Sequence, residues 1–233
     1  MTASLTQFRI QGETRFLQQR VVSHLATCKT TLQNHELPIA VGDAHFVLRP
    51  MAAWCLEQPE LIRHLTEWRK RNQMAFPSIF NVTFAGTLAW FKQRVVEDPE
   101  RLLFGVFDAH DCLVAHAGLA TFDWTTGDCE IDNVMRGDDA APKGLMTAVV
   151  RRLVAYAYQE LGLQSVSLRV FGDNWRAIKL YQNCGFLPVE SLPVECVFTA
   201  TGVNWKTCSE FVSGKTVRIF LRMKHESASS HVT

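Results

Sequence analysis

The sequence predicts a mixed α/β protein with one mainly antiparallel sheet flanked by helices. Short apolar runs, many of them alternating with polar residues, recur along the chain between turn-forming residues and are typical of strands. Stretches with helical periodicity separate these runs, and the resulting order is β-α-α-β-β-β-α-β-α-β. Helices stand between strands only in the second half of this order, which favours a mixed sheet over a regularly alternating parallel one.

The composition is that of a globular protein and limits the class of partner. The 233 residues suffice for one large domain with or without an appendage, and 47% of them are hydrophobic. Lys and Arg number 24 against 23 Asp and Glu, so the charge indicates neither a nucleic acid nor a membrane surface. No segment approaches the roughly 20 apolar residues of a membrane-spanning helix, and the first residues lack the apolar core of a signal peptide.

The seven cysteines indicate a reducing compartment. Their number is odd, their positions are scattered, and no two stand in a C-x-x-C spacing. The pattern indicates neither a disulfide framework nor a metal site. We therefore expect a cytoplasmic protein with reduced thiols.

Residues 1–43 are expected to form an N-terminal helical extension. Helical spacing predicts a helix over 13–33 with an apolar stripe of Leu17, Val21, Leu25, Cys28 and Leu32. This helix is expected to pack on the main domain or on a second subunit, and segment 35–43 is expected to be a linker. The helix and the C-terminal hairpin are the candidate contacts of a homodimer.

The main domain is expected to span residues 44–225. Alternation predicts a strand at 45–51, and Pro59 near the start of an apolar stripe predicts a helix over about 57–72. A loop at 73–81 leads to a second helix over 83–96. Strands at 102–109, 112–122 and 129–136 then form a meander joined by tight turns.

The second half alternates helices with strands. Pro142 and Gly162 bound a long helix, and a strand at 165–171 and a helix at 174–184 follow. Segment 186–199 is expected to be a bent or broken strand, and residues 203–225 a hairpin with Ser213 and Gly214 at its turn. Residues 226–233 are expected to be a disordered tail.

The stretch VFGDNWRAIKLYQNCGF, residues 170–186, carries the most specific signal. Asn174 is a good helix N-cap, and Gly185 can take the left-handed conformation that ends a helix. Val170, Asn174, Ala177, Tyr181, Gly185 and Phe186 stand at the six fixed places of the pattern V-x-x-x-N-x-x-A-x-x-x-Y-x-x-x-G-F, and Ile178 follows Ala177. The stretch thus resembles the C-terminal signature of the GNAT superfamily of acyl-CoA-dependent N-acyltransferases. The resemblance covers about residues 44–190 and implies a sheet of six to seven strands with a V-shaped splay beside strand 129–136.

The resemblance implies acetyl-CoA as the acyl donor and gives roles to the motif. Tyr181 would protonate the departing CoA thiolate, since a phenol of pKa about 10 can protonate a thiolate of pKa about 8.5. Asn174 would hydrogen-bond the pantetheine arm or cap the helix, with Ala177 beside it. Backbone groups of the central strand would bind the same arm, at Asn133, Val134 and Met135.

The family's pyrophosphate loop, Q/R-x-x-G-x-G/A, is degenerate in this chain. Ala141 replaces the Gln or Arg, Met146 replaces the final small residue, and Asp138 and Asp139 add negative charge upstream. A helix N-terminus still offers unpaired amides and a favourable dipole. We therefore expect an anion to face the amides of Lys143, Gly144, Leu145, Met146 and Thr147, with the Met146 side chain turned into the helix packing.

Three residues are candidates for accepting the proton of the attacking amine. Glu130 and Asp132 share one face of strand 129–136, opposite Ile131, Asn133 and Met135. A glutamate on this strand is the base in several relatives, so Glu130 is the first candidate. His116 has an ordinary pKa near 6.5, which also suits a base. No nucleophile elbow G-x-S-x-G is present, which favours direct transfer to the amine.

A softer resemblance concerns the acceptor. The segments WRKRN and EIDNVMRG are similar to those of the subgroup that acylates amino groups on nucleotide-linked sugars. This implies a site with aromatic faces, phosphate-binding arginine and a polar contact, formed by Trp68, Arg69, Phe76, Phe80 and Asp132. The alternatives are a protein N-terminal amine, another small amine, or a non-catalytic module that binds CoA or a partner protein.

Overall fold

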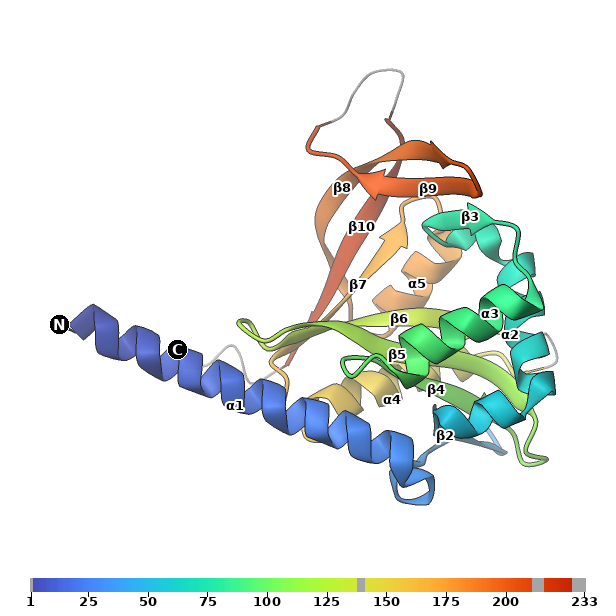
Figure 1. The fold of residues 1–233 in the computed structure, drawn as a ribbon, viewed down its shortest axis with the longest axis horizontal. Coiled ribbons are helices and arrows are strands. Elements are labelled where there is room, and N and C mark those ends of the chain that lie inside the picture. The colour runs from blue at the N-terminus through green and yellow to red at the C-terminus, as the bar shows by residue number, and fades with distance from the viewer. Residues whose placement is uncertain (1, 138–140, 211–215, 228–233) are drawn as a thin grey trace.

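A single sheet organises the chain, of which the computed structural model describes residues 2–137, 141–210 and 216–227. Ten strands follow one another in the order β1-β2-β4-β5-β6-β7-β10-β8-β9-β3 (Figure 1). The strands are β1 (Leu37–Val41), β2 (Ala44–Met51), β3 (Ser78–Phe80), β4 (Leu102–Phe107), β5 (Leu113–Asp123), β6 (Asp128–Arg136), β7 (Ser165–Phe171), β8 (Leu187–Thr199), β9 (Gly202–Thr207) and β10 (Thr216–Glu226). Within these described strands, only β6 and β7 pair in parallel. The mixed, mainly antiparallel sheet is confirmed, with more strands than the six to seven expected.

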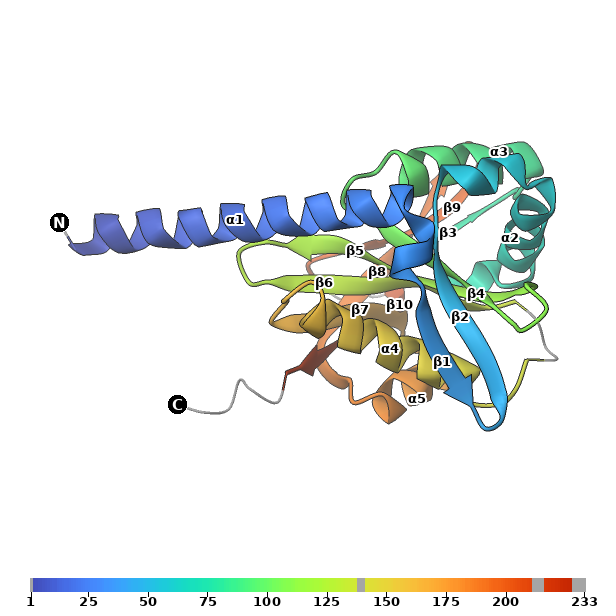
Figure 2. The ribbon, with the colours of Figure 1, turned by 90° about the horizontal axis from the view of Figure 1, so that it is seen from below.

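Helices cover both faces of the sheet (Figure 2). Helices α2 (Pro59–Arg71) and α3 (Phe84–Phe91) lie on one face, and α4 (Leu145–Gln159) and α5 (Trp175–Asn183) lie on the other. Shorter turns connect them, namely η1 (Leu32–His35), η2 (Ala53–Glu57), η3 (Gln73–Ala75) and the π-helical η4 (Lys92–Val96). Among the described helices, none is long and apolar enough to cross a membrane.

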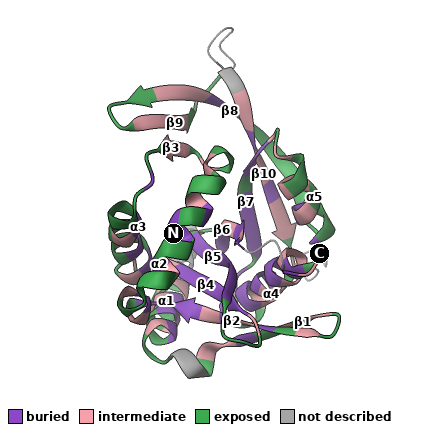
Figure 3. Cartoon of the chain, turned by 90° about the vertical axis from the view of Figure 1, so that its right-hand side faces the viewer, coloured by how far each residue is buried: buried purple, intermediate pink, exposed green. Residues whose placement is uncertain are grey.

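Two hydrophobic cores follow from this arrangement. The larger core lies between the sheet, α4, α5 and the C-terminal half of α1 (Thr2–Thr30). The smaller core lies between the sheet, α2 and α3. Buried residues gather along the central strands β4 to β7 (Figure 3). These strands therefore form the buried layer between the two sets of helices.

Segments 35–43, 73–81 and 203–225 differ from expectation because of how their strands pair. The expected linker 35–43 contains β1, which forms a hairpin with β2 around Gly42 at φ 58°. The expected loop 73–81 contains β3, which pairs with β9. Segment 186–199 contains one strand, β8, that pairs with β10 and β9, and its register against β10 shifts between Pro188 and Glu190, as expected of a bent strand. The expected hairpin over 203–225 is wrong, because among the described residues β9 pairs with β8 and β3, whereas β10 pairs with β7 and β8. Ser213, Gly214 and the tail residues 228–233 lie outside the described residues.

The N-terminal helix is longer at its start and shorter at its end than expected. It spans Thr2–Thr30, and Leu32 belongs to η1. Val21, Leu25 and Cys28 are buried in the larger core, as the apolar stripe predicted. The preceding turns of α1 extend past the sheet (Figure 1).

One buried hydroxyl ties α1 to α4. The Tyr156 oxygen lies 2.9 Å from His24 Nε2 and 3.3 Å from Cys28 Sγ. Tyr156 itself is 2% exposed, and burial raises its pKa. An unpaired hydroxyl in this environment would be costly, so the two contacts fix the position of α1 on the core.

Replacing Tyr156 with Phe should loosen α1. Removing the hydroxyl leaves His24 and Cys28 without this partner, so the free energy of unfolding should fall by about 1–3 kcal/mol in a urea titration. Limited proteolysis should then cleave within α1 faster than in the wild type. Tyr158→Phe is the control, because its hydroxyl bonds to His225 instead. Equal cleavage of α1 in both variants would contradict the anchoring role.

Candidate active site

A cleft opens where β6 and β7 separate. The two strands pair only from Asp128 to Glu130 and from Ser165 to Ser167, although β6 continues to Arg136. This confirms the expected V-shaped splay. The main cleft beyond the splay has a volume of about 560 Å³. It is lined by Arg71, Asn72, Ala75, Phe76, Val134, Met135, Arg136, Pro142, Lys143, Gly144, Leu145, Met146, Thr147, Asn174, Trp175, Arg176, Ala177, Lys179, Leu180, Tyr181 and Asn183.

A β-bulge in β6 shapes this cleft. Asn133 has φ 50°, a conformation that Asn tolerates better than most residues. The pairing of β6 with β5 shifts there, between Asp132 and Met135. As a result Ile131 and Val134 contact the larger core, whereas Met135 belongs to the smaller one. The expected strict alternation, with Ile131 and Met135 on one face, is therefore wrong.

The N-terminus of α4 lines one side of the main cleft. Gly144 precedes the helix at φ 95°, a left-handed conformation that favours glycine. The first helical bond joins the Ala148 amide to the Gly144 carbonyl at 3.0 Å, so the amides of Met146 and Thr147 have no intrahelical acceptor. The side chain of Met146 is half-buried against the larger core and also lines the cleft. Asp138 and Asp139 lie outside the described residues.

Positive charge dominates the lining of the main cleft. Its charged side chains are Arg71, Arg136, Lys143, Arg176 and Lys179, and no described lining residue is acidic. Arg71, Arg176 and Lys179 were not identified as site residues from the sequence. The available signal for the last two was their position on α5: Arg176 lies two residues and Lys179 five residues after the Asn174 cap. The charge suits a ligand with several phosphates.

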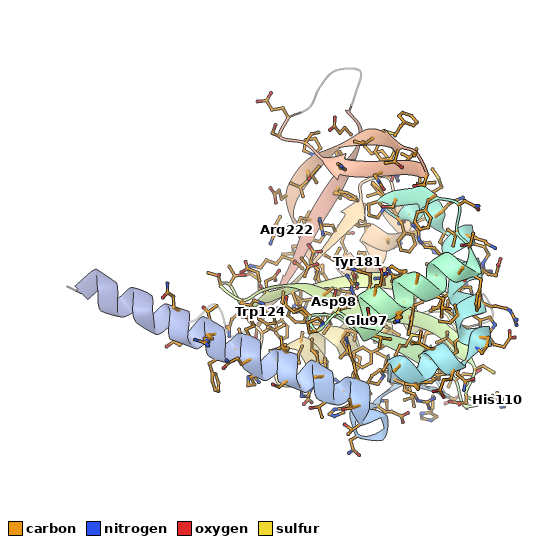
Figure 4. The ribbon with its side chains drawn as sticks, in the orientation of Figure 1. Glu97, Asp98, His110, Trp124, Tyr181 and Arg222 are labelled. Atoms are coloured by element: carbon orange, nitrogen blue, oxygen red, sulfur yellow. The ribbon has the colours of Figure 1, made fainter. Side chains whose placement is uncertain are left out.

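The motif residues meet in the main cleft. The side chain of Asn174 caps α5 by accepting a hydrogen bond from the Ala177 amide at 3.2 Å. Tyr181 lies near the centre of the molecule (Figure 4), is 8% exposed, and packs edge-on against Phe186 at 6.1 Å between ring centroids. Burial raises the pKa of Tyr181, so the phenol keeps its proton at neutral pH.

A side cavity of about 250 Å³ adjoins the main cleft. Phe76 and Met135 line both spaces. Arg69 and Phe80, which were expected in the acceptor site, line the side cavity together with His116, the candidate base, and with Asn133 of the bulge. Trp90 and Ser78 also line it, and nothing in their local sequence distinguished them from core or loop residues.

His116 is a weaker base than the sequence suggested. The residue is 4% exposed, and burial lowers its pKa to about 4, although a bond to the Asn133 backbone acts in the opposite direction. The imidazole is therefore neutral at physiological pH. Its Nδ1 atom is buried and has no hydrogen-bond partner in the described structure.

Three predicted site residues lie elsewhere. Glu130 sits at the paired end of β6 and forms an ion pair with Arg169 at 2.8 Å, so it lines neither cavity. Asp132 is bound by Arg101 and accepts from the Asn133 amide group at 2.9 Å. Trp68 is a core residue: a Cβ at Gly137 would lie 2.0 Å from its ring. The geometry therefore does not support Glu130 as the base or Trp68 as a stacking surface.

One group of metal-ligating side chains lies outside both cavities. The ligand atoms of His24, Cys28 and His35 lie within 4.8 Å of one another. This group contains no C-x-x-C spacing, so the cysteine pattern of the sequence did not indicate it. Two of its members contact the Tyr156 hydroxyl, so the group is accounted for as part of the network that holds α1.

The chain is similar to known proteins at two levels. The family model described as an acetyltransferase (GNAT) domain matches residues 46–187. A search among curated protein sequences finds no significant match. Among solved structures, spermidine N-acetyltransferase from Vibrio cholerae in complex with CoA and spermine has a TM-score of 0.58 at 18% identity, covering 78% of this chain and 95% of that chain. A dodecameric structure of spermidine N-acetyltransferase from Vibrio cholerae has a TM-score of 0.55 at 17% identity, covering 78% and 93%. At such identities the likeness shows the fold alone.

Replacing Arg176 and Lys179 together with Met should weaken CoA binding. Both side chains are exposed, so each contributes at most about 1 kcal/mol, and the double variant should bind CoA roughly 10-fold more weakly. Calorimetry at low and high salt should also show a smaller salt dependence than in the wild type. Lys92→Met, which removes an exposed charge that does not line the cleft, is the control. An unchanged Kd in the double variant would rule out phosphate binding along this part of α5.

The buried His116 should make stability depend on pH. Its pKa is about 4 in the folded state against about 6.5 in an unfolded chain, so the unfolded state binds more protons between these values. The wild type should therefore lose stability as pH falls through this window. His116→Gln lacks this contribution. Urea titrations should therefore show that the unfolding free energy of the wild type decreases relative to that of the variant as the pH is lowered through this window. A constant difference across the window would show that the imidazole is not held neutral by burial.

Proposed function

The chain belongs to the GNAT acetyltransferase family and is an acyl-CoA-dependent acetyltransferase that uses acetyl-CoA, and we propose that its acceptor is the primary amine of a small molecule. The observation that carries the proposal is the main cleft, where Asn174, Tyr181, the β6 bulge and the α4 N-terminus line one cavity. Acetyl-CoA supplies a thioester whose carbonyl carbon the amine attacks. Transfer is direct, as the lack of a nucleophile elbow in the sequence suggested.

The lining residues fit the parts of acetyl-CoA. We assign the pyrophosphate to the free amides of Met146 and Thr147, where the helix dipole also favours negative charge. The backbone of Asn133, Val134 and Met135 is assigned to the pantetheine arm, because the splay leaves this part of β6 without a strand neighbour on the β7 side. Arg176 and Lys179 offset the remaining phosphate charge.

We assign the two proton transfers of the reaction to Tyr181 and His116. The amine nitrogen forms a bond to the acetyl carbon, the carbon–sulfur bond breaks, and Tyr181 donates its phenolic proton to the departing sulfur. The proton lost by the nitrogen passes to His116 or to a water that His116 orients. Glu130 is not proposed as the base, because Arg169 holds it outside both cavities.

A small amine fits the acceptor better than a nucleotide-linked sugar. The neighbouring structures are named spermidine N-acetyltransferases, and one contains spermine. The buried position of Trp68 also removes a ring that was expected to stack on the sugar or base. Of the acceptors considered from the sequence, the small-amine alternative is therefore the one we adopt.

We also propose a cellular location and an oligomeric state. The seven cysteines are all unpaired, which supports a cytoplasmic location. Of the two candidate homodimer contacts, α1 is supported by the exposed Phe16, at 68%. Segment 203–225 does not form the expected hairpin, but β8, with which both β9 and β10 pair, exposes Phe198 at 80%.

Replacing Tyr181 with Phe should slow the chemical step. The change removes one proton donor and keeps the ring packing, so kcat should fall by about 10²–10⁴-fold. The KM for acetyl-CoA should change little, because a group that acts mainly in the transition state contributes little to ground-state binding. Stopped-flow measurement of CoA release with a reactive amine gives both quantities.

The control for this variant is its stability, which should fall by no more than about 1–1.5 kcal/mol, the usual contribution of one hydrogen bond. If the Phe variant keeps more than half of the wild-type kcat while chemistry limits the rate, Tyr181 is not the acid.

A further inference from the structure

The side cavity has the position and size of a subsite for a small acceptor. Because Phe76 and Met135 line both spaces, a molecule in the side cavity is adjacent to one in the main cleft. Its volume of about 250 Å³ is below the roughly 300–1,000 Å³ of most ligand pockets. The occupant should therefore be a small molecule with its reactive end toward Met135.

The charges of the side cavity do not suit a polyamine. Arg69 is the cationic side chain of its wall, and no described Asp or Glu lines it. Most of the remaining wall is aliphatic or aromatic, with Phe80 and Trp90 among the rings. An ammonium group that enters such surroundings loses its hydration and gains no ion pair.

Arg69 presents a charged donor with an unmet hydrogen bond. Its guanidinium carbon lies 3.9 Å from the Phe76 ring centroid and 5.3 Å from that of Phe80. Nη2 donates to the Ser78 carbonyl, whereas Nη1 is buried without a partner in the described structure. Burial lowers the pKa of Arg69 to about 10, so the group stays charged at neutral pH. A carboxylate would satisfy this donor with a charge-assisted bond.

His116 presents the complementary unmet group. Its side chain is more than nine-tenths buried, and Nδ1 has no partner in the described structure. The ring is neutral, so one of its nitrogens carries a lone pair, and in the tautomer with the proton on Nε2 the unpartnered Nδ1 is an acceptor. The wall of one small cavity thus contains a charged donor and a neutral acceptor, both unsatisfied.

We propose that the side cavity binds a small primary amine that also carries a carboxylate, with the carboxylate on Arg69 and the amine toward His116 and the main cleft. This inference rests on the proposed acetyl transfer and narrows the acceptor to amino acids with apolar side chains or similar amino carboxylates. The apolar walls contact the side chain. The products are the N-acetyl amino acid and CoA, with one proton moved from nitrogen to sulfur.

Matched acceptors test this inference. Leucine, phenylalanine and methionine are each compared with the amine that lacks the carboxylate, and spermidine represents the polyamines. The kcat/KM for each amino acid should exceed that for its matched amine by at least about 100-fold, because a site with a buried charged donor rejects an analogue without the partner group. Equal or higher kcat/KM for the matched amines or for spermidine overturns the inference.

Substitutions at two arginines of α2 distinguish loss of carboxylate recognition from loss of folding. Arg69→Met should lower kcat/KM for the preferred amino acid by about 100-fold or more and lower that for the matched amine by much less, since only the amino acid loses a charge-assisted bond. Arg69→Lys keeps the charge but not the planar fork, so it should be intermediate. Arg63→Met is the control, since Arg63 lies on the same helix, is exposed and pairs with Glu60. An equal loss for both acceptors in Arg69→Met, with Arg69→Lys folded and equally impaired, would show that Arg69 only supports the structure.

A binding measurement distinguishes this inference from the proposed function itself. Calorimetry of leucine, phenylalanine and methionine with CoA-saturated protein should show binding that requires the carboxylate and is lost in Arg69→Met. If acetyl-CoA binds and amines are acetylated without preference for a carboxylate, the proposed function stands and the subsite assignment fails. If no amine is acetylated although carboxylate-dependent binding is observed, the subsite assignment stands and the proposed function fails.

Discussion

The separation of β6 from β7 is the constraint on which the site depends. A strand inside a sheet normally has its backbone groups paired on both sides, and unpaired buried groups are costly. Here β7 keeps its full pairing with β10 while β6 turns away after Glu130. The sheet therefore stays continuous, but the end of β6 has exposed donors and acceptors on one edge. A ligand with an amide-containing arm can occupy that edge as a strand would, so an interruption in pairing becomes a binding surface.

The bulge at Asn133 couples this edge to both cores. By adding a residue to β6, it turns Val134 toward the core beneath α4 and Met135 toward the core beneath α2 and α3. Met135 then forms a wall shared by the main cleft and the side cavity. The same local irregularity therefore sets the boundary between the main cleft and the side cavity, and it is held in place by packing on both faces of the sheet.

Local signals made much of the fold and part of the site predictable. The Asn174 cap and the Tyr181 position follow from residues within one helix, and the structure places both in the main cleft. What failed depends on contacts distant in sequence. The ion pair that holds Glu130 comes from β7, and the burial of Trp68 depends on close approach of Gly137. The short strand β3 exists because β9 pairs with it, and three residues carry too little periodicity to show this.

In the proposed mechanism, with the acceptor in the side cavity, the electrostatics of the two spaces also explain how a weak base can suffice. The attacking amine must be neutral, and an ordinary ammonium group has a pKa of about 10.4. Desolvation in the side cavity and the nearby charge of Arg69 both disfavour the ammonium form and lower that pKa. A carboxylate on the same molecule would act the other way, but pairing with Arg69 offsets its charge. His116, with its pKa lowered to about 4, then needs only to orient a neutral amine and to relay a proton that becomes acidic as the carbon–nitrogen bond forms.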